Sequence, residues 1–393
     1  MYSRWWKFFW GALAVVAGFY VARHILLVIL IEGERVDLDI LVRAARRFVV
    51  GESMYRIDDP FEHTKPPLLM GILFPLASLP QFWVRKIWDL VIFIMPVLIL
   101  REALLAWGPD LGGRWRWRPV VLTWALMYPF WYRESEYGQF NLFIFWLILV
   151  GARWIRGPDR RLQIAAGVLA ALTIVIKPTQ LYLVPWLAIV ALDLPSLRSR
   201  LRYAFAGSVL LVVLLALSYF RLRSPAALID DHLEWLRFVP TTTAKHLMGA
   251  NNYGLPTLFS RVGLHSWGTS SAFFPITLLM TSVVVWLLRR RRELALDCSV
   301  LLMLAFSPMS WRANFGVFVV LAYRLSLRIE RSGRDLLAWV GLLCILLFAK
   351  ASEYWLGVPL MNDFGYVAAP LWLMSVAIYC GHFCRDQPSG VLA

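Results

Sequence analysis

The sequence predicts an all-α protein that crosses a membrane many times. Of its 393 residues, 60% are hydrophobic, and the mean hydropathy is +0.62. Apolar runs of about 15–25 residues recur from end to end, which is the length that a bilayer-spanning helix needs. Arginines gather in short clusters between these runs. We therefore expect one membrane-embedded domain, residues 1–393, with about 12 transmembrane helices.

The arginine clusters predict the topology. The first apolar run, residues 8–31, is long and lacks a small-residue cleavage site, so we interpret it as an uncleaved span. The clusters GGRWRWR, RGPDRR, LRSRLR, RRRRE and RIERSGR mark the cytoplasmic side. Topology and lipid headgroups account for the net charge of +15, so we expect no nucleic-acid partner. In this topology, the first outer loop is residues 32–65 and the long outer loop is residues 221–271. A basic tail from about residue 385 lies on the cytoplasmic side.

Residues 66–107 do not fit a simple alternation of spans. They should cross the membrane once in net, yet they contain two apolar elements. The first, PPLLMGILFPLASLP (residues 66–80), has prolines at both ends and in its middle. Prolines break helices, so we expect a partial or re-entrant helix whose backbone is covered by protein.

Metal chemistry has little support in the sequence. The four cysteines lie in or at the ends of apolar segments, where small core residues are common. The segment CGHFC (residues 380–384) offers three ligand types at one helix end, which is a weak signal. We expect no metal site and no cofactor.

The stretch VDLDILVRAARRFVVGESMYR, residues 36–56, predicts an amphipathic helix in the first outer loop. Apolar residues recur at helical spacing, arginines occupy the other face, and Gly51 is placed to end the helix. Asp37 stands where an N-cap residue would be. Two interpretations follow: the helix lies on the outer membrane surface with its arginines at phospholipids and Asp37 as a mere cap, or Asp37 has a functional role.

Five short motifs resemble, in the right order, the GT-C glycosyltransferases and most closely glycosyltransferase family 87. The first outer loop, DLDILVRAARRFVVGESMY followed by KPPLLMGILFPLASLP, is similar to the family's D-L-x-V, G-x-x-x-Y and P-P-L elements. GQFNL (residues 138–142), IKPTQLYLVPWL (residues 176–187) and SPMSW (residues 307–311) are similar to its later segments. The resemblance implies a GT-C fold and polyprenyl-phosphate-mannose-dependent mannosyl transfer.

The resemblance also implies a role for Asp37. In the family, the aspartate at this position is the catalytic base at the outer end of the first span. Asp39, only two residues further on, is the rival, and the placement before L-x-[V/I] favours Asp37. A departing polyprenyl phosphate is already ionised and needs no general acid. One carboxylate therefore suffices where a glycosidase uses two, and it accepts the proton of the acceptor hydroxyl.

The departing phosphate predicts cations and polar groups near Asp37. Lys177 closes a span and could instead snorkel to the interface. Gln139 and Asn141 could hold sugar hydroxyls or bond to neighbouring helices. The candidate substrate-binding residues are Asp39, Arg43, Lys65, Gln139, Asn141, Lys177, His246, Asn251 and Arg312.

Three positions depart from the family pattern. Lys65 precedes the Pro-Pro pair where the family usually has an aromatic residue, and Leu41 replaces a tyrosine. After SPMSW this chain reads WRAN, so the family's acidic residue and histidine are missing and Arg312 stands in that region. The departures bear on the identity of the acceptor and of the donor sugar.

The sequence therefore favours an inverting glycosyltransferase of the inner (plasma) membrane with its site on the extracytoplasmic, periplasmic side. Its expected partners are a polyprenyl-phosphate sugar donor, a lipid or glycan acceptor and membrane lipids. A transporter or flippase for lipid-linked sugars is the first alternative, although no internal repeat is visible. A non-catalytic membrane assembly subunit is the second.

Overall fold

The computed structural model describes residues 4–26, 35–59, 62–107, 116–192, 196–247, 252–264, 266, 270, 272–333 and 335–350. Within these ranges the regular structure is helical, with one isolated bridge between Asn252 and Trp311. The all-α prediction is thus confirmed for the described residues. The helices of the first half are α1 Arg4–His24, α2 Val36–Val50, α3 Met70–Leu73, α4 Gln81–Trp107, α5 Trp117–Tyr137, α6 Asn141–Arg156 and α7 Arg160–Ile176.

The second half continues with α8 Val184–Leu192, α9 Leu197–Tyr219, α10 Pro225–Leu247, α11 Leu255–Arg261, α13 Phe273–Leu287, α14 Arg292–Phe306, α15 Val319–Arg331 and α16 Leu336–Lys350. In the described part of the chain, four 3₁₀ segments join these helices: η2 Pro67–Leu69, η3 Phe74–Ser78, η4 Pro178–Leu183 and η5 Arg312–Phe318. The predicted long outer loop, residues 221–271, is therefore largely helical, because it contains α10 and α11.

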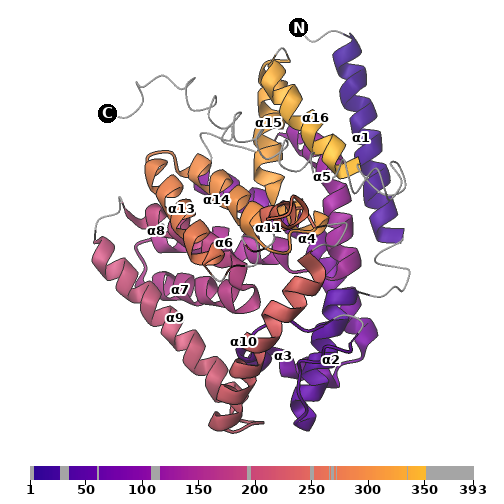
Figure 1. Cartoon of the computed structure of the whole chain (residues 1–393). Helices are drawn as coiled ribbons and strands as arrows, with labels where there is room; N and C mark the ends of the chain where they lie inside the picture. The colour runs from indigo at the N-terminus through magenta and orange to yellow at the C-terminus, as the bar shows by residue number, and fades with distance from the viewer. Residues whose placement is uncertain are drawn as a thin grey trace.

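The helices pack in two groups that meet at α5 and α6 (Figure 1). Helices α1, α15 and α16 pack around α5 at one end of the molecule, and α6, α7 and α9 pack in succession across it. Helices α9 and α10 form a hairpin at the opposite end, beside α2 and α3. The elements that the sequence predicts to be outer thus gather at one end, where α3 and η2 contact α9 and η2 contacts α10.

The number of membrane spans stays a prediction. Among the described helices, only α9 has the length and apolar composition of a span, and just 17% of its apolar window is buried inside the protein. Helices α5 and α6 qualify only together, and they are bent by 109° at the break between them. Residues 351–393, which include the CGHFC segment and the basic tail, lie outside the described residues.

Residues 66–80 form the short, broken element that their prolines predicted. It consists of η2, α3 and η3, and the apolar stretch Pro67–Ser78 is too short to cross a bilayer as a helix. Gly71 brings this element against α9, because a Cβ atom there would lie 2.6 Å from the carbonyl oxygen of Leu215. Ser218 donates a hydrogen bond of 2.6 Å to the Gly71 carbonyl, which satisfies one of the backbone groups that the break leaves free.

Candidate active site

Helix α2 is the amphipathic helix that the sequence predicted, and it ends where predicted. Gly51 follows it in the left-handed conformation, with φ of 82°, and its N–H closes the last turn. Ala44, Ala45 and Phe48 are buried against Tyr219 of α9 and the Met54–Tyr55 segment. Apolar burial of this kind, worth about 25 cal/mol per Å², fixes which face of α2 turns inward.

The predicted N-cap role of Asp37 is wrong. Helix α2 begins at Val36, its N-cap residue is Arg35, and no side chain caps it there. Instead the backbone N–H of Arg35 donates to Oδ2 of Asp39 at 3.2 Å, so Asp39 satisfies the N–H group of the N-cap residue. Asp37 is therefore a residue of the first turn whose carboxylate is not used as a cap.

Two ion pairs connect the first turn of α2 to α4. Arg35 donates to Asp89 from Nε at 2.8 Å and from Nη2 at 2.9 Å. Arg85, one turn earlier on α4, donates to Asp39 from Nε at 2.9 Å and from Nη2 at 2.6 Å. Each pair is bidentate, which restricts orientation as well as distance. Asp37 lies between the two anchored positions, so the pairs hold it in place.

The carboxylate of Asp37 faces two lysines and one amide. It is half-buried, it accepts a side-chain hydrogen bond from Gln139, and it interacts electrostatically with Lys65 and Lys177. Burial raises the pKa of Asp37 above its ordinary value, while the two ammonium groups and the hydrogen bond act in the opposite direction. Asp39, in contrast, has both oxygens engaged by Arg85. The geometry thus favours Asp37 over its rival as a proton acceptor.

Lys65 and Lys177 come from distant parts of the chain. Lys65 lies just before η2, and Lys177 follows the last residue of α7. Burial lowers the pKa of each; the Asp37 carboxylate opposes this at both lysines, and Lys65 adds to the lowering at Lys177. Within the described residues, neither ammonium group has a carboxylate partner at ion-pair distance. Two ammonium groups without such partners beside one acid form a natural site for an anion.

The predicted GQFNL motif lies at the sharp turn between α5 and α6. Asn141 accepts a hydrogen bond of 2.6 Å from Nζ of Lys177 on its Oδ1 atom, and its Nδ2 donates to Oε1 of Gln139 at 2.8 Å. Nδ2 also lies 3.2 Å from Oδ1 of Asn314 in η5. Amides that the sequence left as either sugar ligands or helix contacts therefore link Asp37 to Lys177.

Two residues that the sequence analysis did not single out complete this network. Glu134 on α5 is fully buried and accepts hydrogen bonds from the Leu142 N–H at 2.7 Å and from Asn141 Nδ2 at 3.3 Å. Asn314, three residues after the SPMSW motif, anchors its own amide on the Met309 carbonyl at 3.1 Å. The available signals were their positions, because Glu134 lies four residues before the GQFNL motif and Asn314 lies three residues after the SPMSW motif.

Two other residues predicted to bind substrate, Arg43 and His246, contact carboxylates of the first outer loop in the structure. Arg43 lies 3.6 Å from Asp59, which also binds Arg47 through two hydrogen bonds of 2.6 and 2.8 Å. His246 contacts Glu62 at 2.8 Å, beside the ion pair of Lys245 with the same carboxylate. Substrate binding by Arg43 and His246 stays a prediction. Asn251 and the side chain of Arg312 lie outside what the structure describes.

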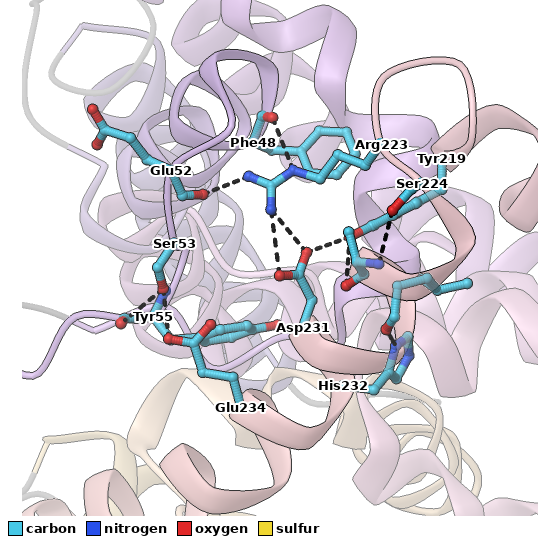
Figure 2. A network of polar contacts seen from close by, with 12 residues as sticks. Phe48, Glu52, Ser53, Tyr55, Tyr219, Arg223, Ser224, Asp231, His232 and Glu234 are labelled. Atoms are coloured by element: carbon cyan, nitrogen blue, oxygen red, sulfur yellow. Dashed lines mark hydrogen bonds and ion pairs between the residues drawn. The ribbon is translucent and has the colours of Figure 1, made fainter.

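Helix α10 and Arg223 before it hold the first outer loop at residues 48–55 (Figure 2), and α10 also contacts the backbone next to Lys65. Arg223, just before α10, donates to the Phe48 carbonyl at 3.2 Å and pairs with Asp231, which also binds Tyr219. Ser53 donates to Glu234 at 2.7 Å. Further along α10, Trp235 donates to the Thr64 carbonyl at 3.0 Å. One face of α10 therefore fixes the first outer loop, including the backbone next to Lys65.

The whole arrangement can be compared with known families. A sequence profile described as glycosyltransferase family 87 matches residues 63–308, which is more than half of the chain. The chain belongs to glycosyltransferase family 87. The match includes Lys65, Gln139 and Asn141, as well as Lys177, whereas Asp37 precedes it. A comparison with curated proteins found no match.

Membership of family 87 confirms the resemblance that the motifs suggested and makes the protein a glycosyltransferase. The assignment of the sugar, the lipid and the acceptor depends on the chemistry that Asp37, the two lysines and the amides could perform together. Among the described residues, no group of three or more possible ligands could hold a metal ion.

At Gly138, the backbone conformation and the nearby atoms of α2 and its N-cap residue both favour glycine. The φ of Gly138 is 68°, and a Cβ atom there would lie 2.8 Å from Cβ of Leu38 and 3.1 Å from that of Arg35. We expect Gly138→Ala to destabilise the fold by more than the roughly 1–2 kcal/mol of left-handed strain, because it also pushes α2 away. Thermal unfolding in detergent and transfer activity should both fall.

Gly51→Ala is the matched control for this prediction. Gly51 has a similar φ of 82°, but nothing lies within 4 Å of the position that its Cβ would take. It should therefore show the backbone strain alone, about 1–2 kcal/mol. Equal losses of stability and activity in the two variants would contradict the close approach of α2 to the turn at Gly138.

Proposed function

We propose that this glycosyltransferase moves a sugar, mannose by its family resemblance, from a polyprenyl-phosphate donor to a lipid or glycan acceptor at the outer face of the membrane. The observation that supports the proposal is one carboxylate, Asp37, beside two ammonium groups that form no ion pair with a carboxylate in the described part of the chain. A base next to an anion site suits an acceptor hydroxyl attacking a sugar phosphate.

The proposed step is a single displacement. The acceptor oxygen forms a bond to the anomeric carbon while the bond from that carbon to the phosphate oxygen breaks. Asp37 takes the proton of the acceptor hydroxyl, and the leaving electron pair stays on the polyprenyl phosphate. Attack opposite the leaving group inverts the anomeric centre. No general acid is needed, because the phosphate leaves as an anion.

Lys65 and Lys177 would stabilise the charge that grows on the departing phosphate. The Lys177 ammonium is held before the reaction by Asn141 at 2.6 Å, and the backbone that carries Lys65 is fixed by hydrogen bonds from Tyr55 to the Lys65 carbonyl at 2.8 Å and from Trp235 to the Thr64 carbonyl at 3.0 Å. Fixed charges stabilise a transition state more effectively than groups that must first reorganise. Asp37 remains an available base because Lys65, Lys177 and Gln139 favour its ionised form.

Purified protein in proteoliposomes with radiolabelled polyprenyl-phosphate mannose tests the proposal. Release of polyprenyl phosphate with formation of a labelled glycolipid, or slow hydrolysis of the donor without an acceptor, would support it. Movement of the intact donor across the bilayer without cleavage would contradict it and favour a flippase. Neither cleavage nor movement by folded protein would also contradict it and favour an assembly subunit.

A further inference from the structure

Glu134 is a buried carboxylate at the sharpest bend of the site. It belongs to the last turn of α5, four residues before Gly138, where α5 and α6 meet at 109°. Its side chain is fully buried, yet it forms no ion pair with a basic residue in the described ranges. A carboxylate is expensive to bury without such a partner, so its hydrogen bonds require an explanation.

The first hydrogen bond makes Glu134 a remote cap of α6. The N-cap residue of α6, Phe140, has no side chain that can accept a hydrogen bond, and the Leu142 N–H points instead at Oε1 of Glu134, 2.7 Å away. Negative charge at this end of α6 is favoured by the helix dipole. This contact alone would give Glu134 a purely structural role.

The second hydrogen bond leads from Glu134 into the site. Nδ2 of Asn141 points at Oε2 of Glu134, at Oε1 of Gln139 and at Oδ1 of Asn314, all of which are acceptors. Oδ1 of Asn141 accepts from the ammonium of Lys177. The Asn141 amide therefore has one possible orientation. Because Gln139 accepts from Asn141 on its oxygen, its NH₂ group is left to donate to Asp37.

We propose that Glu134 is a positioning residue for transfer: by orienting the Asn141 amide it directs the Gln139 NH₂ group to Asp37 and holds Lys177 in the anion site. This inference rests on the proposed function. Glu134 touches neither the donor nor the acceptor in this scheme. It acts through Asn141, and its charge acts on the nearby ammonium group.

Glu134→Gln separates the positioning role from the capping role. The amide oxygen of glutamine still caps the Leu142 N–H, whereas its NH₂ group would face the NH₂ group of Asn141. The Asn141 amide keeps Gln139 and Asn314 as acceptors, but it meets a donor in place of the Glu134 carboxylate, which pushes it out of its position. We expect kcat to fall by about 10- to 100-fold, within the range of a misplaced catalytic group.

The pH profile supplies a readout that capping alone would not change. The charged groups acting on Lys177 are Lys65, which lowers its pKa, and Glu134 and Asp37, which raise it, while burial lowers it most. Removing the charge of Glu134 therefore lowers the pKa of Lys177 further. The ammonium loses its proton earlier on titration, and the alkaline limb of kcat/KM should move to lower pH in Glu134→Gln.

Two further variants complete the experiment. Glu134→Asp keeps the charge but cannot reach both Leu142 and Asn141, so the alkaline limb should stay in place while kcat falls; this variant also serves if Glu134→Gln does not fold. Glu102→Gln is the matched control, because Glu102 is 2% exposed, lies on α4 and pairs with Arg101 and Arg153 away from the site. It should retain the wild-type profile.

The outcomes distinguish the two proposals. No sugar transfer by the folded wild-type protein would overturn both of them. Transfer that continues unchanged in Asp37→Asn would overturn the role of Asp37 as the base and, with it, the positioning role of Glu134. Transfer that depends on Asp37, together with a wild-type alkaline limb in folded Glu134→Gln, would overturn only the positioning role. A wild-type kcat in Glu134→Asp, or an equal loss in Glu102→Gln, would also overturn it.

Discussion

Asp37→Asn should lower kcat for sugar transfer by about 10²–10⁴-fold while the protein still folds and binds the donor. Asparagine has nearly the same volume as aspartate and can still meet the Gln139 amide, but it cannot accept the proton of an acceptor hydroxyl. The measurement is single-turnover transfer from radiolabelled polyprenyl-phosphate mannose, with donor affinity determined separately. A loss in kcat with little change in donor affinity is the expected pattern.

Asp39→Asn is the control for this prediction. Asp39 is two residues away and equally acidic, but its carboxylate is bound by Arg85 at 2.6 and 2.9 Å and by the Arg35 N–H. Its loss should lower stability by about 1 kcal/mol, as for a partly exposed ion pair, with a much smaller effect on kcat. Full activity in Asp37→Asn with loss only in Asp39→Asn would move the base to Asp39.

The helix that carries these two aspartates, α2, was predicted from the sequence only in part. The apolar stripe and Gly51 predicted α2 and its end, because both signals are local. The start of the helix was wrong because it depends on a partner far along the chain: the N-cap residue Arg35 is bound by Asp89 of α4, 54 residues away. No pattern within residues 32–51 reveals that contact.

The residues of the candidate site were also predicted only in part. Gln139, Asn141 and Lys177 were predicted from motifs in the right order, and in the structure Gln139 and Lys177 act on Asp37 while Asn141 links the two. Glu134 and Asn314 were not singled out, because a polar residue beside a motif has no distinguishing local pattern. The prediction for Arg43 did not foresee Asp59, with which the structure pairs it. Such pairings between residues far apart in the sequence follow from how the segments pack, which no local pattern encodes.

Replacing both lysines, Lys65→Met with Lys177→Met, should reduce kcat/KM by at least about 10²–10³-fold, the cost of removing one well-placed electrostatic group. Methionine keeps much of the apolar volume of lysine, so the loss would reflect charge. Each single variant should lose less, because the remaining ammonium still faces the phosphate. Transfer rates and donor binding in detergent, measured on all three variants, separate the effect on affinity from that on turnover.

The same two lysines and Asp37 predict a bell-shaped pH dependence. Asp37 must be ionised to accept a proton, and its pKa is raised by burial, so activity should rise as pH passes through that raised value. The lysines must be protonated to bind phosphate, and burial lowers the pKa of each. Activity should therefore fall again as the pH rises, and this fall should begin at a lower pH than the one at which an ordinary lysine loses its proton. Burial and neighbouring cations lower the pKa of His63 to about 3, so this nearby histidine stays neutral throughout.

Lys177→Arg then tests the origin of the alkaline limb. A guanidinium keeps its proton at any pH at which the protein is folded, so the contribution of residue 177 to that limb should move to higher pH. Because Asn141 accepts from Lys177 at 2.6 Å, the longer side chain will also lower the maximal rate. An alkaline limb that stays at its wild-type position in Lys177→Arg and in the Lys65→Met variant would contradict an anion site built from these lysines. The growing phosphate charge would then have to be stabilised by other groups.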